Sequence, residues 1–134
     1  MKIKVLPFGT YQIERKHYND AGADCYIQES VTIEAHQTVK IPLKFGLEIP
    51  DGHVGYILPR SSVAAKGFCV HPVPIDSGYR GQIHAIVTNL NPYPFLFEAG
   101  DRIGQIVIHP IVLADFVEEL GEERGEGAFG STGK

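Results

Sequence analysis

Residues 31–43 read VTIEAHQTVKIPL, and apolar and polar side chains alternate through both halves of this stretch. Apolar residues stand at positions 31, 33 and 35, and again at positions 39, 41 and 43. Successive side chains of a β-strand point to opposite faces of the sheet, so an alternation with a period of two is typical of half-buried strands. The stretch therefore predicts two short strands, each with one apolar face.

Other segments of the chain extend this strand pattern. Residues 83–90 and 103–113 are more continuously apolar, as expected of strands that are buried on both faces. Turn-forming sequences separate the segments, namely Pro50-Asp51-Gly52, Asn91-Pro92 and Ala99-Gly100-Asp101. With 15 Gly and 9 Pro at short intervals, the sequence predicts an all-β sandwich or barrel of many short strands.

Helical signals are limited to one short segment. Residues 61–67 (SSVAAKG) have a serine suited to cap a helix, good helix formers and a terminal glycine, which predicts one or two turns. Residues 111–120 fit either a strand or a short amphipathic helix. From residue 121 the chain is rich in glycine and charge. We therefore expect a β domain over residues 1–120 and a tail over residues 121–134 that is flexible on its own.

Composition narrows the class of protein. The formal net charge of −4 argues against a nucleic-acid polymer as ligand, because such binding depends on neutralising many phosphates. No stretch approaches the ~20 apolar residues of a membrane-spanning helix, and no signal peptide is recognisable, so a soluble cytoplasmic protein is expected. Cys25 and Cys69 fit no zinc or redox spacing, and we expect both thiols to be reduced and buried.

The sequence Leu58-Pro59-Arg60-Ser61-Ser62 brings an arginine and two hydroxyls to the expected start of the helix. Free backbone N–H groups and the helix dipole favour an anion at such a position, and the guanidinium of Arg60 adds a forked, permanently charged donor. A phosphate site is one interpretation. A capped surface helix with an ordinary arginine is the other.

Asp76 follows an apolar run and precedes a turn, so we expect a half-buried carboxylate that faces a cleft. A carboxylate in that position can orient and deprotonate a water molecule. The alternative is an aspartate that only accepts N–H bonds within its own turn. Tyr79, three residues later, fits either the rim of a pocket or the core.

Two further segments add polar groups. Residues 100–105 (GDRIGQ) open a strand and by themselves fit a β-turn with a surface ion pair. In the tail, Phe129 stands among glycines with nothing obvious to pack on, which indicates a lid over a ligand. The spacing of a Walker phosphate-binding loop is absent from the sequence.

Taken in order, these segments resemble the five sequence motifs of the trimeric dUTPase family. The matching residues are 20–24 (DAGAD), 59–62 (PRSS), 75–81 (IDSGYRG), 100–105 (GDRIGQ) and, in the tail, 124–125 (RG) with 129–133 (FGSTG). Each motif alone has low specificity, but five in this order over most of the chain are highly specific.

The resemblance implies an all-β, jelly-roll-like barrel or sandwich of the β-clip type that is mostly antiparallel. It implies a homotrimer whose active sites are shared between subunits. It also implies a dUTP diphosphatase, which hydrolyses dUTP to dUMP and pyrophosphate with Mg²⁺, keeping uracil out of DNA and supplying dUMP for dTMP synthesis.

The same resemblance assigns roles to individual residues. Asp76 is implied to be the base that orients the attacking water and to contact the 3′-hydroxyl, while Tyr79 stacks beneath the sugar. Asp24 is implied to hold Mg²⁺ through water, together with substrate phosphates. Phe129 would cover the uracil, and the tail would close a neighbouring subunit's site. The implied nucleotide ligands from the second, fourth and fifth motifs are Arg60, Ser61, Ser62, Gln105, Arg124, Phe129, Gly130, Ser131 and Thr132.

The chain departs from the family pattern at two positions. The usual Gly-Val-Ile-Asp of the third motif is replaced by Val73-Pro74-Ile75-Asp76, and Ser62 stands where glycine is common. Backbone groups of the hairpin before Asp76 are expected to recognise uracil. Because Pro74 lacks an N–H, its presence bears on base recognition more than on catalysis.

Three other functions are compatible with parts of the sequence. A dCTP deaminase would need a glutamate where this chain has Ile86, and no carboxylate lies between Asp76 and Glu98. A non-enzymatic jelly-roll module would explain the strands but not the motif residues or the tail. The third alternative is an enzyme that also acts as a nucleotide-gated partner of another protein, and the sequence contains no signal for or against it.

Overall fold

The structure, a computed structural model, describes residues 1–121. Within that part of the chain there are eleven strands and one short helix, and no helix is long and apolar enough to cross a membrane. The elements, in chain order, are β1 (Lys4–Pro7), β2 (Ile13–Glu14), β3 (Ala23–Tyr26), β4 (Val31–Ile33), β5 (Thr38–Pro42), β6 (Phe45–Glu48), β7 (His53–Pro59), α1 (Ser61–Ala65), β8 (Phe68–Val70), β9 (His84–Asn89), β10 (Phe95–Phe97) and β11 (Arg102–Pro110).

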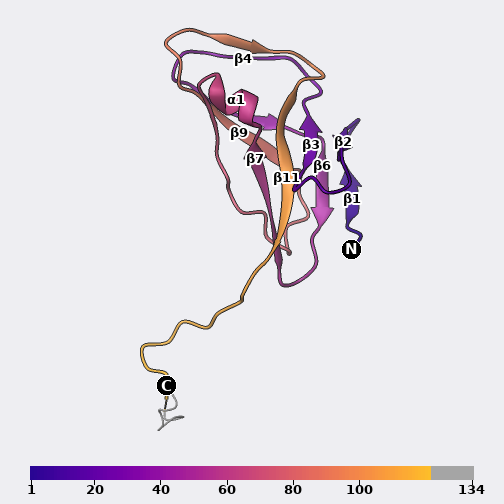
Figure 1. Cartoon of the computed structure of the whole chain (residues 1–134), viewed down its shortest axis with the longest axis vertical. Coiled ribbons are helices and arrows are strands. Elements are labelled where there is room, and N and C mark those ends of the chain that lie inside the picture. The colour runs from indigo at the N-terminus through magenta and orange to yellow at the C-terminus, as the bar shows by residue number, and fades with distance from the viewer. Residues whose placement is uncertain (122–134) are drawn as a thin grey trace.

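The strands form small antiparallel sheets around a common core. The largest sheet has the order β2-β3-β11-β7, a second has the order β5-β9-β8, and β1-β6 and β10-β4 are two-stranded. Strand β11 runs through the middle of the body between β3 and β7, and α1 lies near its upper end (Figure 1). All strand pairs described are antiparallel. The predicted all-β class, mostly antiparallel with one short helix, is confirmed for residues 1–121.

Burial follows the alternation in residues 31–43. Ile33 in β4 and Ile41 in β5 are buried, whereas Thr32 and Lys40 beside them are exposed. Ile33 joins one hydrophobic cluster with residues from the other sheets, including the fully buried Phe45 of β6. The sheets are therefore held together by a single core, to which β4 and β5 each contribute one face.

Strands β9 and β11 differ from the prediction in part. β9 alternates between buried and half-buried residues, so the expectation of burial on both faces was wrong for this strand. Ala85 and Val87 enter the core, whereas Ile86 points to the other face and lines a pocket. β11 ends at Pro110, where its ladder with β7 also ends, because Pro110 is paired with the first residue of β7.

Helix α1 occurs where the sequence predicts it, but its N-terminus differs. The N-cap is Arg60, in an extended conformation and without a side-chain cap, so the expected capping serine was wrong. The carbonyl of Arg60 accepts the N–H groups of Val63 and Ala64 at 3.1 and 3.0 Å, which begins the helix at Ser61. The predicted terminal glycine is confirmed, since Gly67 has a φ of +92° and donates its N–H to Ala64.

Residues 111–120 form neither a strand nor a helix. The N–H of Ile111 donates to the carbonyl of Gly52 at 2.9 Å, and the chain then leaves the body (Figure 1). No strand of residues 1–121 continues alongside this segment, so it lacks a ladder partner within the chain. Its apolar side chains are exposed, including Phe116 at 95% and Val112 at 89%.

The two cysteines are free and do not form a disulfide. Cys25 is buried as expected, and this burial raises the pKa of its thiol to about 12. Cys69 is only half-buried, so the expectation of burial was wrong for this residue.

Asn89 is the buried polar residue of the core and joins two sheets. Its side-chain Nδ2 donates to the carbonyls of Ile33 and Tyr93 at 3.0 and 2.8 Å, and its Oδ1 accepts the N–H of Asn91 at 2.9 Å. The side chain is fully buried, so each of these groups would lose its partner if the amide were removed.

We predict that Asn89→Ala lowers the free energy of unfolding by roughly 2–4 kcal/mol, because buried carbonyls are left unpaired and a cavity forms. Urea unfolding at fixed protein concentration measures the change. The matched control is Asn19→Ala, at an exposed loop position, which should stay within about 0.5 kcal/mol of wild type. Equal effects of the two substitutions would contradict this role of Asn89.

Candidate functional site

Three strands bring the first, second and fourth motifs together. On β11, Gln105 is paired with Asp24 of β3 on one side and with Leu58 of β7 on the other. Side chains directly opposite one another share a face of the sheet. Arg60 lies two residues beyond Leu58 in an extended backbone, so its side chain is expected on the same face as that of Leu58. The Nε2 of Gln105 donates to the carbonyl of Pro59 at 3.4 Å. We call Asp24, Arg60, Ser61, Ser62 and Gln105 the β11 cluster.

The β11 cluster presents charged and polar groups at the start of α1. Arg60 and Gln105 are half-buried, and Ser61 and Ser62 are exposed. The side chains of Arg60 and both serines make no hydrogen bond with other residues of the range 1–121. A guanidinium, two hydroxyls and an amide with remaining donors are suited to bind the oxygens of an anion such as phosphate.

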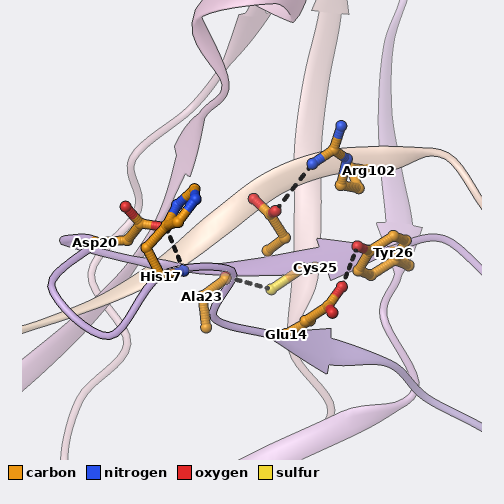
Figure 2. Close-up of polar contacts among 8 residues, drawn as sticks. Glu14, His17, Asp20, Ala23, Cys25, Tyr26 and Arg102 are labelled. Carbon is orange, nitrogen blue, oxygen red and sulfur yellow. Dashed lines mark hydrogen bonds and ion pairs between the residues drawn. The ribbon is translucent and has the colours of Figure 1, made fainter.

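Asp24 is held by an ion pair across the sheet. The Nη1 of Arg102 lies 3.2 Å from the Oδ2 of Asp24, which is the dashed contact of Arg102 in Figure 2. Sequence reasoning considered a surface ion pair at residues 100–105 but did not identify Asp24 as the partner. The partner is set by strand pairing across 78 positions of the chain, for which one sequence holds no local signal.

Two glycines allow the strands of this cluster to approach closely. A Cβ on Gly22 would lie 2.5 Å from the Oε1 of Gln105, and a Cβ on Gly104 would lie 2.8 Å from the carbonyl oxygen of Leu58. Either contact is shorter than real carbon atoms accept. Glycine at position 104 therefore makes room for the β11–β7 ladder, and glycine at position 22 leaves the amide of Gln105 in its place.

A short turn fixes the entry to β3 (Figure 2). The backbone N–H of His17 donates to the Oδ2 of Asp20 at 2.9 Å, and the ring of His17 lies 3.1 Å from the same oxygen. The guanidinium of Arg15 donates to the carbonyl of Asp20. The hydrogen bond from the backbone of His17 lowers the pKa of the Asp20 carboxyl. Asp20, the first residue of the first motif, thus has a structural contact in this turn.

The third motif lines a separate pocket of about 260 Å³. One wall consists of the chain between β8 and β9, with Asp76 and Tyr79, and the opposite wall is the outer face of β9, with Ile86. This is the face of β9 that was expected to be buried by other strands. We call this cavity the hairpin pocket.

Asp76 stands at the edge of the hairpin pocket and is exposed, so the expectation of a half-buried carboxylate was wrong for the single chain. Its backbone carbonyl accepts the N–H of Tyr79 at 3.0 Å and closes a turn. Its carboxylate, in contrast, accepts no hydrogen bond from the part of the chain that the structure describes. The alternative of an aspartate that caps its own turn therefore lacks the required contact.

Tyr79 is held at the rim of the same pocket. Its hydroxyl donates to the carbonyl of Gln82 at 2.7 Å, and 45% of the residue is exposed. A Cβ on Gly81 would lie 2.5 Å from the Oη of Tyr79, so the glycine of the third motif makes room for this ring. The ring is available as a flat surface at the pocket's mouth.

Four polar residues of the hairpin pocket were missed by sequence reasoning, because they stand outside the motifs: Lys40, His71, Gln82 and His84. Burial and the neighbouring charge of Lys40 lower the pKa of His84, which favours the neutral ring. His84 and Ile86 are two residues apart in β9, and side chains two residues apart in a strand share a face. This alternation is the sequence signal that could have placed both in the pocket.

Arg60 of the β11 cluster and Asp76 of the hairpin pocket lie near opposite ends of β7. Ile75 forms an antiparallel bridge with Gly55, so Asp76 lies level with Val54, six residues before Arg60. At the rise of an extended strand this corresponds to about 20 Å. Within one chain, Asp76 and Arg60 therefore do not reach the same atom of a ligand. The predicted tail ligands Arg124, Phe129, Gly130, Ser131 and Thr132 lie outside the described residues.

The fold and the geometry of the site define a small antiparallel β protein. Its candidate site residues form two separate groups, the β11 cluster, which is suited to bind an anion, and the hairpin pocket, which is suited to bind a nucleoside. The sequence model of the dUTPase family matches residues 11–133. The deoxyuridine 5'-triphosphate nucleotidohydrolase of Corynebacterium diphtheriae is 44% identical over 126 residues, covering 89% of this chain and 83% of that protein. The corresponding protein of Tropheryma whipplei is 35% identical over 141 residues, covering 100% and 97%.

Solved structures of dUTPases have a fold similar to that of this chain. A mutant dUTPase of phage phi11 of S. aureus, in which coordination of a structural Mg(II) ion is seen, superimposes with a TM-score of 0.83 at 25% identity, covering 89% of this chain and 98% of that one. A mutant dUTPase of Staphylococcus bacteriophage 80alpha with dUpNHpp gives a TM-score of 0.82 at 29% identity, covering 99% of each chain. The chain belongs to the dUTPase family, and its fold is the predicted jelly-roll-like one.

Proposed function

We propose that this protein is a dUTP diphosphatase, which hydrolyses dUTP to dUMP and pyrophosphate and so keeps uracil out of DNA and supplies dUMP for dTMP synthesis. Relatives that carry the name deoxyuridine 5'-triphosphate nucleotidohydrolase support the substrate. The observation that carries the reaction type is the hairpin pocket, which is lined both by Asp76, whose carboxylate has no partner among residues 1–121, and by the apolar wall residue Ile86. A deaminase would need a glutamate at that wall position.

Asp76 is the proposed general base. Its carboxylate oxygens have no hydrogen-bond partner among residues 1–121, so one can accept the proton of an attacking water while the other accepts the sugar 3′-hydroxyl. Tyr79 provides the flat surface beneath the deoxyribose, where close packing leaves no partner for a 2′-hydroxyl. The water attacks the α-phosphorus, the bond to the β-phosphate oxygen breaks, and pyrophosphate leaves.

The β11 cluster is the proposed triphosphate site. Arg60 donates a charged fork to phosphate oxygens, and Ser61, Ser62 and Gln105 add neutral donors. Among residues 1–121 no group of three or more His, Cys, Asp or Glu side chains converges, which fits Mg²⁺ held mainly by phosphates and water. Asp24 is the carboxylate suited to it, since Arg102 contacts only its Oδ2. When bound, Mg²⁺ would neutralise charge that develops on the phosphates.

We further propose a homotrimer with shared active sites. The separation of about 20 Å along β7 means that Asp76 of one subunit must meet Arg60 of another to act on one phosphorus atom. Residues 111–120 support the same proposal, because their apolar side chains are exposed in the single chain, and a contiguous exposed apolar segment marks an association site.

The tail completes the proposed site as a lid that closes a neighbouring subunit's active site. Arg124, Gly130, Ser131 and Thr132 would bind the γ-phosphate end, and Phe129 would cover the uracil. Burial of one phenylalanine gives about 1.5–3 kcal/mol, and ordering a few residues costs more than that, so the lid closes only when nucleotide adds its own contacts. Closure expels water from the α-phosphate.

The substrate assignment is tested by incubating purified protein and Mg²⁺ with dUTP, dCTP, dTTP or UTP and identifying the products. We expect dUMP and pyrophosphate from dUTP alone, and a loss of roughly two to four decades in kcat in Asp76→Asn with nucleotide binding retained. Asn keeps the shape of the side chain and removes its charge. Ammonia from dCTP, comparable turnover of UTP, or full activity of the variant would contradict the proposal.

The shared site predicts complementation between two inactive variants. Asp76→Asn and Arg60→Gln, mixed by co-refolding, form trimers in which some sites receive an intact Asp76 and an intact Arg60 from different subunits. Random mixing should restore about a quarter of wild-type activity, since each of two residues is intact in half of the subunits. A mixture as inactive as its components would show that both residues act within one chain.

The lid predicts that deletion of residues 124–134 removes most activity and leaves stability and assembly unchanged. The melting temperature and the mass by light scattering should match the full-length protein, because the tail contributes little burial. Phe129→Ala should show a milder loss of activity. Full activity after deletion would refute the lid, and dissociation into monomers would instead identify the tail as a structural clamp.

A further inference from the structure

A second polar pocket adjoins the β11 cluster. Its volume is about 260 Å³, and residues of α1, of β10 and of the turn that leads into β11 line it. Arg60 and Ser62 belong both to the β11 cluster and to the lining of this pocket. Lys66 and Arg102 line it as well, and sequence reasoning proposed neither of them as a ligand. We call this cavity the cation pocket.

The cation pocket carries an excess of positive charge. Arg60, Lys66 and Arg102 line it, and Asp101 is the one carboxylate among the described residues of its lining. Within residues 1–121 neither Arg60 nor Lys66 forms an ion pair. Asp101 is engaged in its own turn, where its Oδ2 accepts the N–H of Glu98 at 2.9 Å. Like charges that line one pocket repel one another, so the pocket favours an anion.

Arg102 is the cation with a fixed position in this pocket. Its Nη1 lies 3.2 Å from the Oδ2 of Asp24, as Figure 2 shows, and 33% of its side chain is exposed. The other N–H groups of the guanidinium have no acceptor among residues 1–121. A guanidinium holds its donors in one plane, so binding one end to Asp24 sets the direction of the rest. Lys66, in contrast, is exposed, and its flexible side chain can follow an anion.

Apolar side chains form the rest of the cation pocket. Phe95 and Phe97 line it with ring centroids 4.8 Å apart, and the ring of Phe68 packs against each of them at 4.9 Å. Phe97 and Val63, which also lines the pocket, are buried. Apolar walls of low dielectric concentrate the field of nearby charges. The three cations therefore act on an anion more strongly here than they would on an open surface.

The size of the pocket and its charges select the class of ligand. Pockets for drug-sized molecules measure ~300–1,000 Å³, and the cation pocket is smaller. Its donors are charged side chains, which are suited to the oxygens of a small polyanion such as a diphosphate. The proposed reaction releases such an ion, pyrophosphate, from the phosphate site at Arg60, which both sites share.

Pyrophosphate differs from the same two phosphates within dUTP. In dUTP the β- and γ-phosphates are tethered to a nucleoside, whose binding in the proposed hairpin pocket limits how far they reach. Cleavage at the α-phosphorus removes the tether, and the bridging oxygen leaves with pyrophosphate as a new terminal oxygen. The free ion thus has one more acceptor for a cation and is able to move from the β11 cluster toward Lys66 and Arg102.

We propose that the cation pocket is the product site for pyrophosphate, an inference that rests on the proposed dUTP hydrolysis. Arg60 contacts the ion in both positions, Arg102 binds it in a fixed orientation, and the ammonium of Lys66 binds its outer oxygens. Transfer to this pocket separates pyrophosphate from the α-phosphate of dUMP and so prevents its reverse attack on that phosphorus.

The test compares Lys66→Gln with wild type in the full-length protein, by calorimetric binding of inorganic pyrophosphate at fixed ionic strength with Mg²⁺ present. We expect the Kd for pyrophosphate to rise roughly tenfold, the value of one charge-assisted hydrogen bond. The Kd for dUpNHpp should rise by no more than about twofold, because the tethered phosphates stay at the β11 cluster. Lys66→Arg, which keeps the charge, should restore the affinity for pyrophosphate to within about threefold of wild type.

Lys4→Gln is the matched control, because Lys4 is an exposed lysine of β1 outside the pocket. It should match wild type in both Kd values. The same affinity for pyrophosphate in Lys66→Gln and Lys4→Gln would overturn the inference, as would wild-type protein that does not bind pyrophosphate. If Lys66→Gln loses affinity for pyrophosphate and dUpNHpp by the same factor, the pocket is part of the triphosphate site, and a separate product site is refuted.

Calorimetry requires no turnover, so failure of this inference is distinguishable from failure of the proposed function. If wild type releases no pyrophosphate from dUTP, the proposed reaction is wrong, and the role of a product site is lost with it. If wild type hydrolyses dUTP while Lys66→Gln binds pyrophosphate as wild type does, the product site alone is refuted.

Discussion

The pairing of β11 with both β3 and β7 is the constraint on which the rest of the structure depends. Gln105 is held between Asp24 and Leu58, so one strand register sets the positions of three sequence motifs. Gly104 permits the close approach of β7, and Gly22 leaves room for the side chain of Gln105. A slip by one residue would turn Gln105 to the opposite face, which is why this ladder has to be defined on both sides.

The sequence predicted the parts of the fold that depend on local chemistry. The alternation of apolar and polar residues at 31–43 identified β4 and β5, and Gly67 identified the end of α1. Both signals are local, because the alternation of side chains and the left-handed conformation of a glycine involve only a few adjacent residues. The candidate residues of the site were chosen by the order of their motifs along the chain, and their roles stay predictions. The pairing of Arg102 with Asp24 was not found, since it depends on which strands become neighbours.

The sequence predicted the positions of the strands better than the burial of individual side chains. In the proposed trimer, the burial of Ile86, Asp76 and the apolar side chains of residues 111–120 depends on surfaces that a single chain does not supply. An exposed Phe116 and a half-buried Ile86 are poor choices for an isolated domain, but they are reasonable for a subunit whose partners complete the pocket and cover the segment.

Pro72 and Pro74, which precede the third motif, limit what the backbone of this wall of the hairpin pocket can offer a ligand. A backbone N–H that reads a base is available whatever the local residue is, except where that residue is proline. With Pro72 and Pro74 in place and Val73 bonded to His71, residues 72–74 have no free N–H. A group that contacts a ligand from this wall of the pocket therefore has to be a carbonyl or a side chain. The Thr38–Thr88–His71 contacts hold one such side chain, the ring of His71, in a fixed place beside the outer face of β5 and β9.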